Sequence, residues 1–266
     1  MSAAELFADE SPIADLGVAE RSREARDGAV IRDIRYAGAD GREVAAYVVT
    51  PETGTPRGGV LFLHWQGEDT SSREQYLPEA VRVAASGLAS VLITQRFPWA
   101  ERPSGVEHDR VAVGFQVRTI RRAVTILAGA AGAVPLAVVG HDFGAMYGTL
   151  LRGVDERPTA YVLLAPTATW ADWFVTYFHV VGAGEAPAYE TGMADVDPVT
   201  WLPEASAPIL LQLAAGDQYV LPEAVSALEA AAGEAAETRT YEATHRLNDQ
   251  ARDERVAWLL EALGLT

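Results

Sequence analysis

The stretch VVGHDFGAMYG, residues 138–148, decides the fold. Its first residues end an apolar run that predicts a buried strand, and its last residues begin a helix. Gly140 and Gly144 stand two positions either side of Asp142 and leave room for a very tight strand-to-helix turn. The central residue of such a turn takes a strained backbone conformation, so we expect the Asp142 side chain to be thrust outward at the end of the strand.

Buried strands and amphipathic helices alternate on both sides of this turn. The predicted strands are Val30–Tyr36, Val44–Thr50, Val60–Leu63, Val91–Thr94, Leu136–Val139, Ala160–Leu164, Ile209–Leu213 and Arg239–Tyr241. The predicted helices are Ser72–Ala85, Val106–Ala128, Phe143–Arg152, Pro222–Ala232 and Asp249–Leu263. This alternation predicts an α/β fold with a mostly parallel, doubly wound sheet flanked by helices, whose ligands bind at the carboxyl ends of the strands. The first two strands are expected as an antiparallel hairpin at the sheet edge, after a loose acidic lead-in.

The length of 266 residues and a hydrophobic content of 49% suit a single domain over residues 1–266. Residues 167–204 interrupt the alternation, look loop-like and carry many bulky side chains. A segment of this kind over the strand ends predicts a small lid. Its bulky residues are Trp170, Trp173, Phe174, Tyr177, Phe178, His179, Tyr189 and Trp201.

The formal charge of −16 makes nucleic acid and anionic membranes unlikely partners, because both repel an acidic surface. Arg118, Arg121 and Arg122 are interpreted as the solvated face of one helix. Without cysteine, the chain has no disulfide, thiolate metal site or cysteine nucleophile. No export signal or membrane-spanning segment is visible, so a cytoplasmic location is expected.

The turn at Asp142 resembles the nucleophile elbow of the α/β-hydrolase fold, with aspartate as the nucleophile. The chain order of that fold is nucleophile, acid, histidine, and Asp217 and His245 follow the last two predicted strands in that order. His64-Trp65-Gln66-Gly67 after the first buried strand is similar to its oxyanion loop. The resemblance covers roughly Val44 to Leu265, and the chain most resembles the dienelactone hydrolase branch.

That branch uses cysteine or serine, whereas the GHDFG elbow is similar to those of epoxide hydrolases and haloalkane or haloacid dehalogenases. A carboxylate with a pKa of about 3.9 is already charged at neutral pH and needs no base to attack. Its attack on a carbonyl would give an anhydride, but attack on a carbon bearing a halide or an epoxide oxygen gives an alkyl ester. The resemblance then implies that His245, oriented by Asp217, activates the water that hydrolyses the ester on Asp142.

The same resemblance assigns the other site residues. The backbone N–H groups of Trp65 and Phe143 are expected to form the oxyanion hole. The substrate, a small molecule, is expected to meet His64, Gln66, Arg96, Trp170, Trp173 and Tyr177. Arg96 and Arg102 could bind a substrate carboxylate or be solvated loop charges. Tyr177 and Tyr189 would serve an epoxide, and Trp65, Trp170 or Trp173 a halide. No metal-ligand spacing or phosphate-binding loop is present, so no metal or cofactor is implied.

Several simpler interpretations stay open. Asp142 could be a helix N-cap, Asp217 a turn residue and His245 a surface histidine. The lid aromatics could serve only for packing, and His64 could only hold its loop in shape. Three functions therefore remain: a hydrolase of epoxides or carbon–halogen bonds with Asp142 as nucleophile, a dienelactone hydrolase-like esterase or lactonase with Asp142 as general base, and a non-catalytic scaffold that binds a small molecule.

Overall fold

The computed structural model describes residues 2–266 apart from 67–70, 97–104, 178, 180 and 205, which leaves Gly67, Arg102 and Phe178 outside the described residues. The strands are β1 Ala19–Arg26, β2 Ala29–Ala37, β3 Glu43–Pro51, β4 Gly58–Leu63, β5 Leu88–Ile93, β6 Leu136–His141, β7 Pro158–Leu164, β8 Ile209–Ala214 and β9 Ala236–Tyr241. The α-helices are α1 Ala3–Phe7, α2 Leu77–Ala84, α3 Val106–Ala131, α4 Phe143–Val154, α5 Ala186–Met193, α6 Pro198–Trp201, α7 Pro222–Ala232 and α8 Asp249–Ala262.

The described strands form one sheet in the order β1-β2-β3-β5-β4-β6-β7-β8-β9. Strands β5, β4, β6, β7, β8 and β9 pair in parallel, and β1, β2 and β3 join them antiparallel. This confirms the predicted mostly parallel, doubly wound sheet. The chain moves outward from β4 to β5 and then returns to place β6 on the other side of β4. The loops after β4 and β6 therefore meet at a switch point, where open α/β sheets bind ligands.

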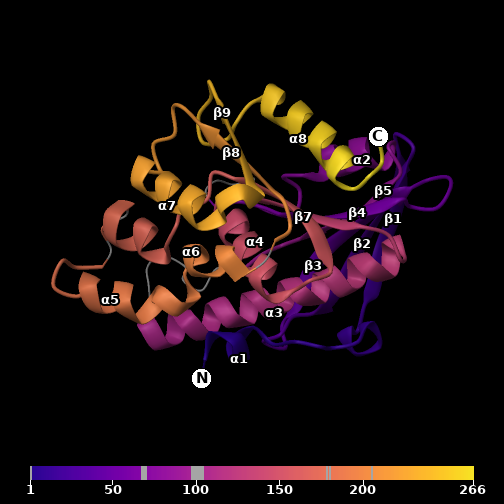
Figure 1. The fold of residues 1–266 in the computed structure, drawn as a ribbon. Coiled ribbons are helices and arrows are strands. Elements are labelled where there is room, and N and C mark those ends of the chain that lie inside the picture. Colours follow the sequence, from indigo (N-terminus) through magenta and orange to yellow (C-terminus); the bar gives the residue numbers. More distant parts are fainter. Residues whose placement is uncertain (1, 67–70, 97–104, 178, 180, 205) are drawn as a thin grey trace.

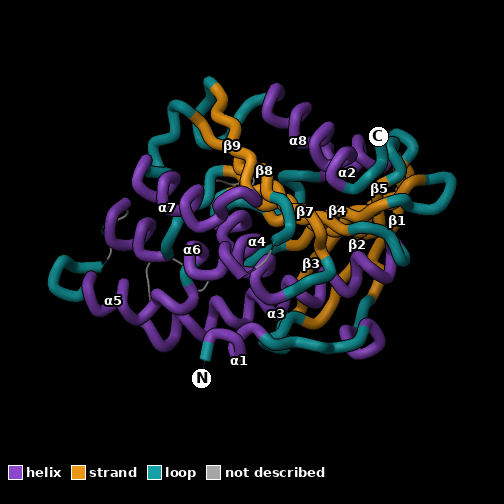
Figure 2. The backbone as a smooth tube through the Cα atoms, in the orientation of Figure 1, coloured by secondary structure: helices purple, strands orange, loops and turns teal. Residues whose placement is uncertain are grey.

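Helices cover both faces of the sheet and give it two separate cores (Figures 1 and 2). Alternate residues of β4 point to opposite sides: Leu61 and Leu63 pack with α3, α4 and α7, whereas Val60 and Phe62 pack with α2 and α8. Every residue of β4, β5 and β6 is buried. Strands covered on both faces carry continuous apolar runs, and this makes them easy to recognise in the sequence.

The segment before the predicted hairpin is ordered, so the expectation of a loose lead-in is wrong. Helix α1 begins with a capping box in which the Ser2 hydroxyl accepts from the Glu5 amide and the Glu5 carboxylate accepts from the Ser2 amide. Strand β1 then pairs with β2 and becomes the sheet edge, so β2 and β3 are interior strands. Arg121 and Arg122 donate to the Phe7 carbonyl and to Asp9, and thereby anchor this segment on α3 instead of forming a solvated face.

Two further differences concern element boundaries. Helix α2 begins at Leu77, later than the predicted Ser72, and has a proline in its first turn. Residues 167–204 are built mainly of short helical pieces, including a π-helical turn at Asp172–Tyr177, rather than of loop. No helix in the described part of the chain is both long and apolar enough to cross a membrane.

Candidate active site

The turn between β6 and α4 has the conformation predicted from its glycines. Asp142 has φ 56° and ψ −119°, a strained backbone for a residue with a side chain. A Cβ atom on Gly144 would lie 2.6 Å from the carbonyl oxygen of His64 and would also clash with that of Leu63. Helix α4 thus starts directly against the end of β4. Only glycine permits this close approach, which brings Asp142 to the loop after β4.

We expect Gly144→Ala to lower the free energy of unfolding by about 2–4 kcal/mol, because the new methyl group meets backbone atoms that cannot rotate away. Urea denaturation followed by circular dichroism measures this loss. Gly184→Ala is the matched control, since a Cβ there meets no atom within 4 Å. Equal stability of the two variants would show that the turn tolerates a side chain.

His245 and Asp217 form the pair expected from their order in the chain. The His245 Nδ1 atom lies 2.8 Å from Asp217 Oδ2, and both side chains are buried. Asp217 Oδ1 accepts from the amides of Tyr219 and Val220 at 2.9 and 3.2 Å, so the turn holds the carboxylate in place. Burial acts to raise the pKa of Asp217, but the hydrogen bonds from His245 and these amides leave it below its ordinary value.

The Asp142 carboxylate lies next to His245, and its two oxygens have different surroundings. Oδ2 accepts the backbone N–H of Gln66 at 3.0 Å, and the Phe143 amide also stabilises the carboxylate. Oδ1 is buried, has no hydrogen-bond partner among the described residues and lies 4.0 Å from His245 Nε2. Asp142 occupies the N-cap position of α4, but its side chain makes no capping hydrogen bond.

Burial raises the pKa of Asp142 from 3.8 to about 7, because it penalises the charged form in a site with little water. Neighbouring His245 and the amides of Gln66 and Phe143 act in the opposite direction and limit the rise. A carboxylate with these surroundings is ionised in part at neutral pH and is poorly solvated when it is ionised.

Comparison with solved structures agrees with this architecture. Acetyl xylan esterase 1 from Thermoanaerobacterium sp. JW/SL YS485 is similar with a TM-score of 0.73 and 14% identity, over 98% of this chain and 91% of that one. The acetyl xylan esterase from Paenibacillus sp. R4 gives 0.72 and 17%, over 98% and 92% of the two chains. A Pyrococcus furiosus esterase gives 0.63 and 15%, over 88% and 91%. The chain has the α/β-hydrolase fold. No protein-family model and no curated protein matches the sequence.

The loop after β4 turns the amide of Gln66, and not the predicted amide of Trp65, toward Asp142. The Trp65 amide donates to Gln75 Oε1 at 2.8 Å, so it does not face Asp142, and the Gln66 amide takes that place. His64 holds the loop: its Nδ1 lies 2.6 Å from the Trp65 carbonyl, and its Nε2 accepts the Gln95 amide at 2.8 Å. Burial lowers the pKa of His64 to about 4, so the ring is neutral at pH 7.

A hydrogen-bonded chain that the sequence did not reveal joins this loop to the histidine loop. Gln75, whose Oε1 accepts from Trp65, lies with its Nε2 2.9 Å from His141 Nδ1. His141 Nε2 lies 2.8 Å from the backbone carbonyl of His245. Burial lowers the pKa of His141 to about 3, and the neutral ring donates from Nε2 and accepts at Nδ1. This Gln75–His141 bridge fixes the spacing of the two loops.

Aromatic side chains wall the site on the side of the lid. The centroid of the Trp173 ring lies 5.1 Å from that of Phe143 and 6.3 Å from that of His245. The ring centroids of Tyr177 and Tyr219 are 4.8 Å apart. Tyr219, which sequence reasoning missed, lies 4.9 Å from the His245 ring. Its only sequence signal is its position two residues after Asp217.

Two predicted substrate contacts, Trp170 and Arg96, and the predicted epoxide donor Tyr189 have their polar atoms bound to groups outside the site around Asp142. Trp170 is fully buried behind Phe143 and donates from its indole to the Val196 carbonyl. The Tyr189 hydroxyl donates to Asp109. Arg96 points to the β2–β3 turn, where its Nη2 donates to the Glu43 carbonyl at 2.9 Å. The described residues contain no group of three or more side chains suited to a metal ion.

Proposed function

We propose that this protein is a hydrolase in which Asp142 forms an alkyl ester with the substrate and His245 then activates water to cleave it. One observation carries the proposal: a buried carboxylate has one oxygen held by the Gln66 amide, while the other has no hydrogen-bond partner among the described residues and lies 4.0 Å from a histidine that is itself held by a carboxylate. A helix cap would accept from the amide of the second or third helical residue, and the Asp142 side chain makes no such bond.

In the first step, Asp142 Oδ1 attacks a saturated carbon, and the bond from that carbon to a halogen or an epoxide oxygen breaks. The electron pair leaves with the halide or with the alkoxide. Tyr219, whose ring lies beside that of His245, and Tyr177, whose ring lies beside that of Tyr219, are suited to give the alkoxide a proton. The Trp65 indole N–H, buried and unpartnered within the described residues, is suited to a halide. The substrate class is therefore an epoxide or an organohalogen.

In the second step, His245 Nε2 takes a proton from water as the water oxygen bonds to Cγ of Asp142. The resulting oxyanion is stabilised by the Gln66 amide, which already holds Oδ2, and by the Phe143 amide, which also acts on the carboxylate. The bond between Cγ and the alkylated oxygen then breaks, and the product alcohol takes the proton from His245. Asp142 is left as a carboxylic acid that contains the oxygen of the water molecule. Its proton then passes to the tyrosinate left by an epoxide, or to solvent beside the halide, and this restores the carboxylate.

The second candidate is an esterase in which Asp142 is the base for direct attack by water. Its support is the raised pKa of Asp142, which suits a proton acceptor at neutral pH, together with the esterase names of the similar structures. The two mechanisms differ in the fate of the water oxygen. A single turnover in ¹⁸O-water labels Asp142 in the covalent mechanism and labels the acid product in the esterase.

His245→Gln tests the proposal, because it leaves the attack by Asp142 intact and blocks the water step. After incubation with a panel of epoxides, haloacids, haloalkanes and activated esters, the intact mass should rise by one substrate-derived group, mapped to the peptide that contains Asp142. His179→Gln, an exposed histidine with its Nδ1 at the Val175 carbonyl, is the matched control and should accumulate no adduct. No adduct, with ester turnover by the unaltered protein, would replace the proposal with the esterase mechanism.

A further inference from the structure

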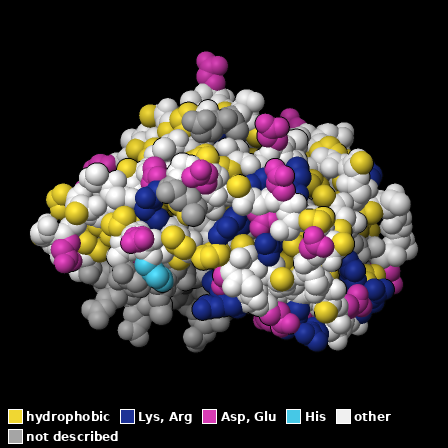
Figure 3. Space-filling model, turned by 90° about the horizontal axis from the view of Figure 1, so that it is seen from below, with side chains coloured by type: hydrophobic (Ala, Val, Ile, Leu, Met, Phe, Trp, Pro, Cys, Tyr) yellow, Lys and Arg dark blue, Asp and Glu magenta, His cyan; other side chains and the backbone are white. Residues whose placement is uncertain are grey.

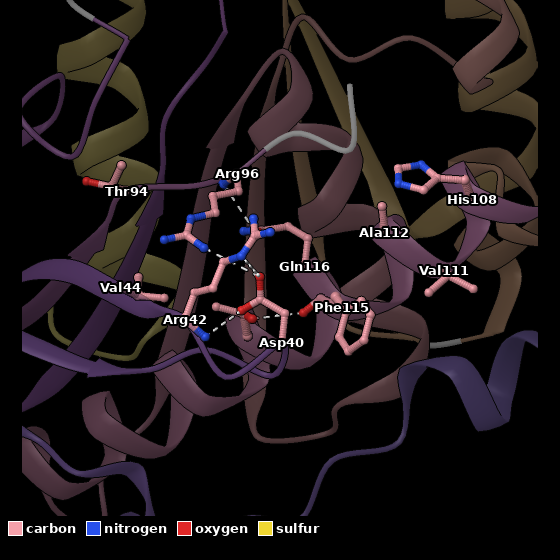
Figure 4. A pocket seen from close by; sticks show the side chains of 11 residues that line it. Asp40, Arg42, Val44, Thr94, Arg96, His108, Val111, Ala112, Phe115 and Gln116 are labelled. Atoms are coloured by element: carbon pink, nitrogen blue, oxygen red, sulfur yellow. Dashed lines mark hydrogen bonds and ion pairs between the residues drawn. The ribbon is translucent and has the colours of Figure 1, made fainter. Parts of the chain in front are cut away.

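A pocket lies away from Asp142, between the β2–β3 turn, the end of β5 and the first half of α3 (Figure 4). Its volume of about 430 Å³ is in the range of small-molecule sites. None of its lining residues belongs to the group formed by Asp142, Asp217 and His245. Arg96, expected from the sequence to meet the substrate, lines this pocket instead. This observation does not depend on the reaction proposed for Asp142.

Positive charge exceeds negative charge in this pocket. Arg42 Nε and Arg96 Nη1 lie 3.6 and 3.4 Å from the same oxygen, Oδ2 of Asp40 (Figure 4). Two guanidinium groups thus share one carboxylate, in a chain whose formal charge is −16. On the face shown in Figure 3, basic and acidic side chains are interspersed. An excess of cations at a concave site favours an anion.

A buried amide adds a second, independent feature. Gln116 is 5% exposed, and its Oε1 accepts the Arg96 backbone N–H at 3.3 Å. Its Nε2 is buried and has no partner among the residues that the structure describes. A buried donor without an acceptor is unfavourable, and an oxygen atom of a ligand would satisfy it. Phe115 and Val111, from the same helix, give the pocket an apolar wall.

We propose that this pocket binds a small organic carboxylate. The carboxylate would lie between Arg42 and Arg96, with an oxygen atom in reach of Gln116 Nε2, and the apolar part of the molecule would lie against Phe115. Asp40 then competes with the ligand for the two guanidinium groups. Removal of an arginine and removal of Asp40 should therefore change the affinity in opposite directions.

Isothermal titration calorimetry with phenylacetate, and with phenylacetamide as the neutral analogue, tests the proposal. We expect saturable binding of phenylacetate and at least about tenfold weaker binding of phenylacetamide, because only the former makes charge-assisted hydrogen bonds. Arg42→Gln and Arg96→Gln should each weaken phenylacetate binding about tenfold, and Asp40→Asn should strengthen it severalfold. Arg26→Gln, at an exposed arginine on β1, is the matched control and should change nothing.

Asp142→Asn should bind phenylacetate as the unaltered protein does, and a changed affinity in that variant would place the ligand at the elbow and overturn the proposal. Equal affinity for phenylacetate and phenylacetamide would also overturn it. So would the absence of saturable phenylacetate binding in the unaltered protein and in Asp40→Asn alike. The side chain of Arg42 is 73% exposed, so its replacement leaves the fold intact and decides the matter even if Arg96→Gln does not fold. Thermal melting of each variant confirms that the folded protein is titrated.

Discussion

Asp142→Asn is expected to lower kcat by about four or more orders of magnitude, because an amide cannot form the ester intermediate. Below the Asp142 pKa of about 7, adduct formation by His245→Gln should fall about tenfold per pH unit, since only the carboxylate attacks. Turnover of a substrate found with the panel gives the first result, and the rate of adduct formation by intact mass from pH 5 to pH 9 gives the second. Asp27→Asn, at a surface turn with φ 51°, is the matched control. Full activity of Asp142→Asn would disprove the nucleophile assignment.

The same variant should gain stability while it loses activity. Because the folded-state pKa of Asp142 is raised from 3.8 to about 7, its proton stabilises the fold at low pH, and this contribution is lost as the pH rises through that interval. Asparagine does not titrate. The difference in the free energy of unfolding between Asp142→Asn and the unaltered protein should therefore grow in favour of the variant between pH 4 and pH 7, and then stay constant. Its upper limit is about 4 kcal/mol, from about three pH units at 1.36 kcal/mol each. Urea denaturation at several pH values measures it, and a constant difference would contradict the assigned pKa.

Arg255→Met should lower the free energy of unfolding by about 3–5 kcal/mol, the largest loss expected here, because it leaves the Glu79 carboxylate buried without its partner. Glu79 and Arg255 are 4% and 6% exposed, and Arg255 Nε donates to Glu79 Oε1 at 2.8 Å. The pair joins α2 to α8 on one face of the sheet. The free energy of unfolding in urea is the quantity to measure.

Two variants make this second prediction specific. Glu79→Leu combined with Arg255→Met should recover most of the loss, since no buried charge remains. Arg82→Met breaks the exposed pair between the same two helices, that of Arg82 with Asp253, and should cost less than about 1 kcal/mol. A loss in Arg255→Met no larger than that in Arg82→Met would mean that water reaches Glu79.

The elements that the sequence predicted correctly are those with a strong local signal. The buried strands β4 to β7 are short apolar runs, and the elbow is set by glycines that admit a close backbone approach. Strand β1 was missed because its sequence AERSREAR has no apolar alternation, as nearly all its residues are exposed. A strand of this kind is defined by its pairing with β2 and not by its own pattern.

In the site, chain order and motif placed Asp142, Asp217 and His245, but hydrogen-bond directions could not be deduced. Whether Trp65 or Gln66 turns its amide toward Asp142 depends on Gln75, which captures the Trp65 amide from outside the motif. The hydrogen bond between Gln75 and His141 has no signal in the sequence, because only the fold brings Gln75 Nε2 to 2.9 Å from His141 Nδ1. Arg96 likewise points away from the elbow because Asp40 and the Glu43 carbonyl are its nearest acceptors.

The Gln75–His141 bridge makes the arrangement around Asp142 a preorganised one. A site that assembles its dipoles only when a substrate arrives must spend part of the binding energy on reorganisation, which then is not available to lower the barrier. Here the loop that bears the Gln66 amide and the loop that bears His245 are joined through two neutral side chains, the half-buried Gln75 and the buried His141. The donors for the developing negative charge are therefore already oriented before a substrate binds.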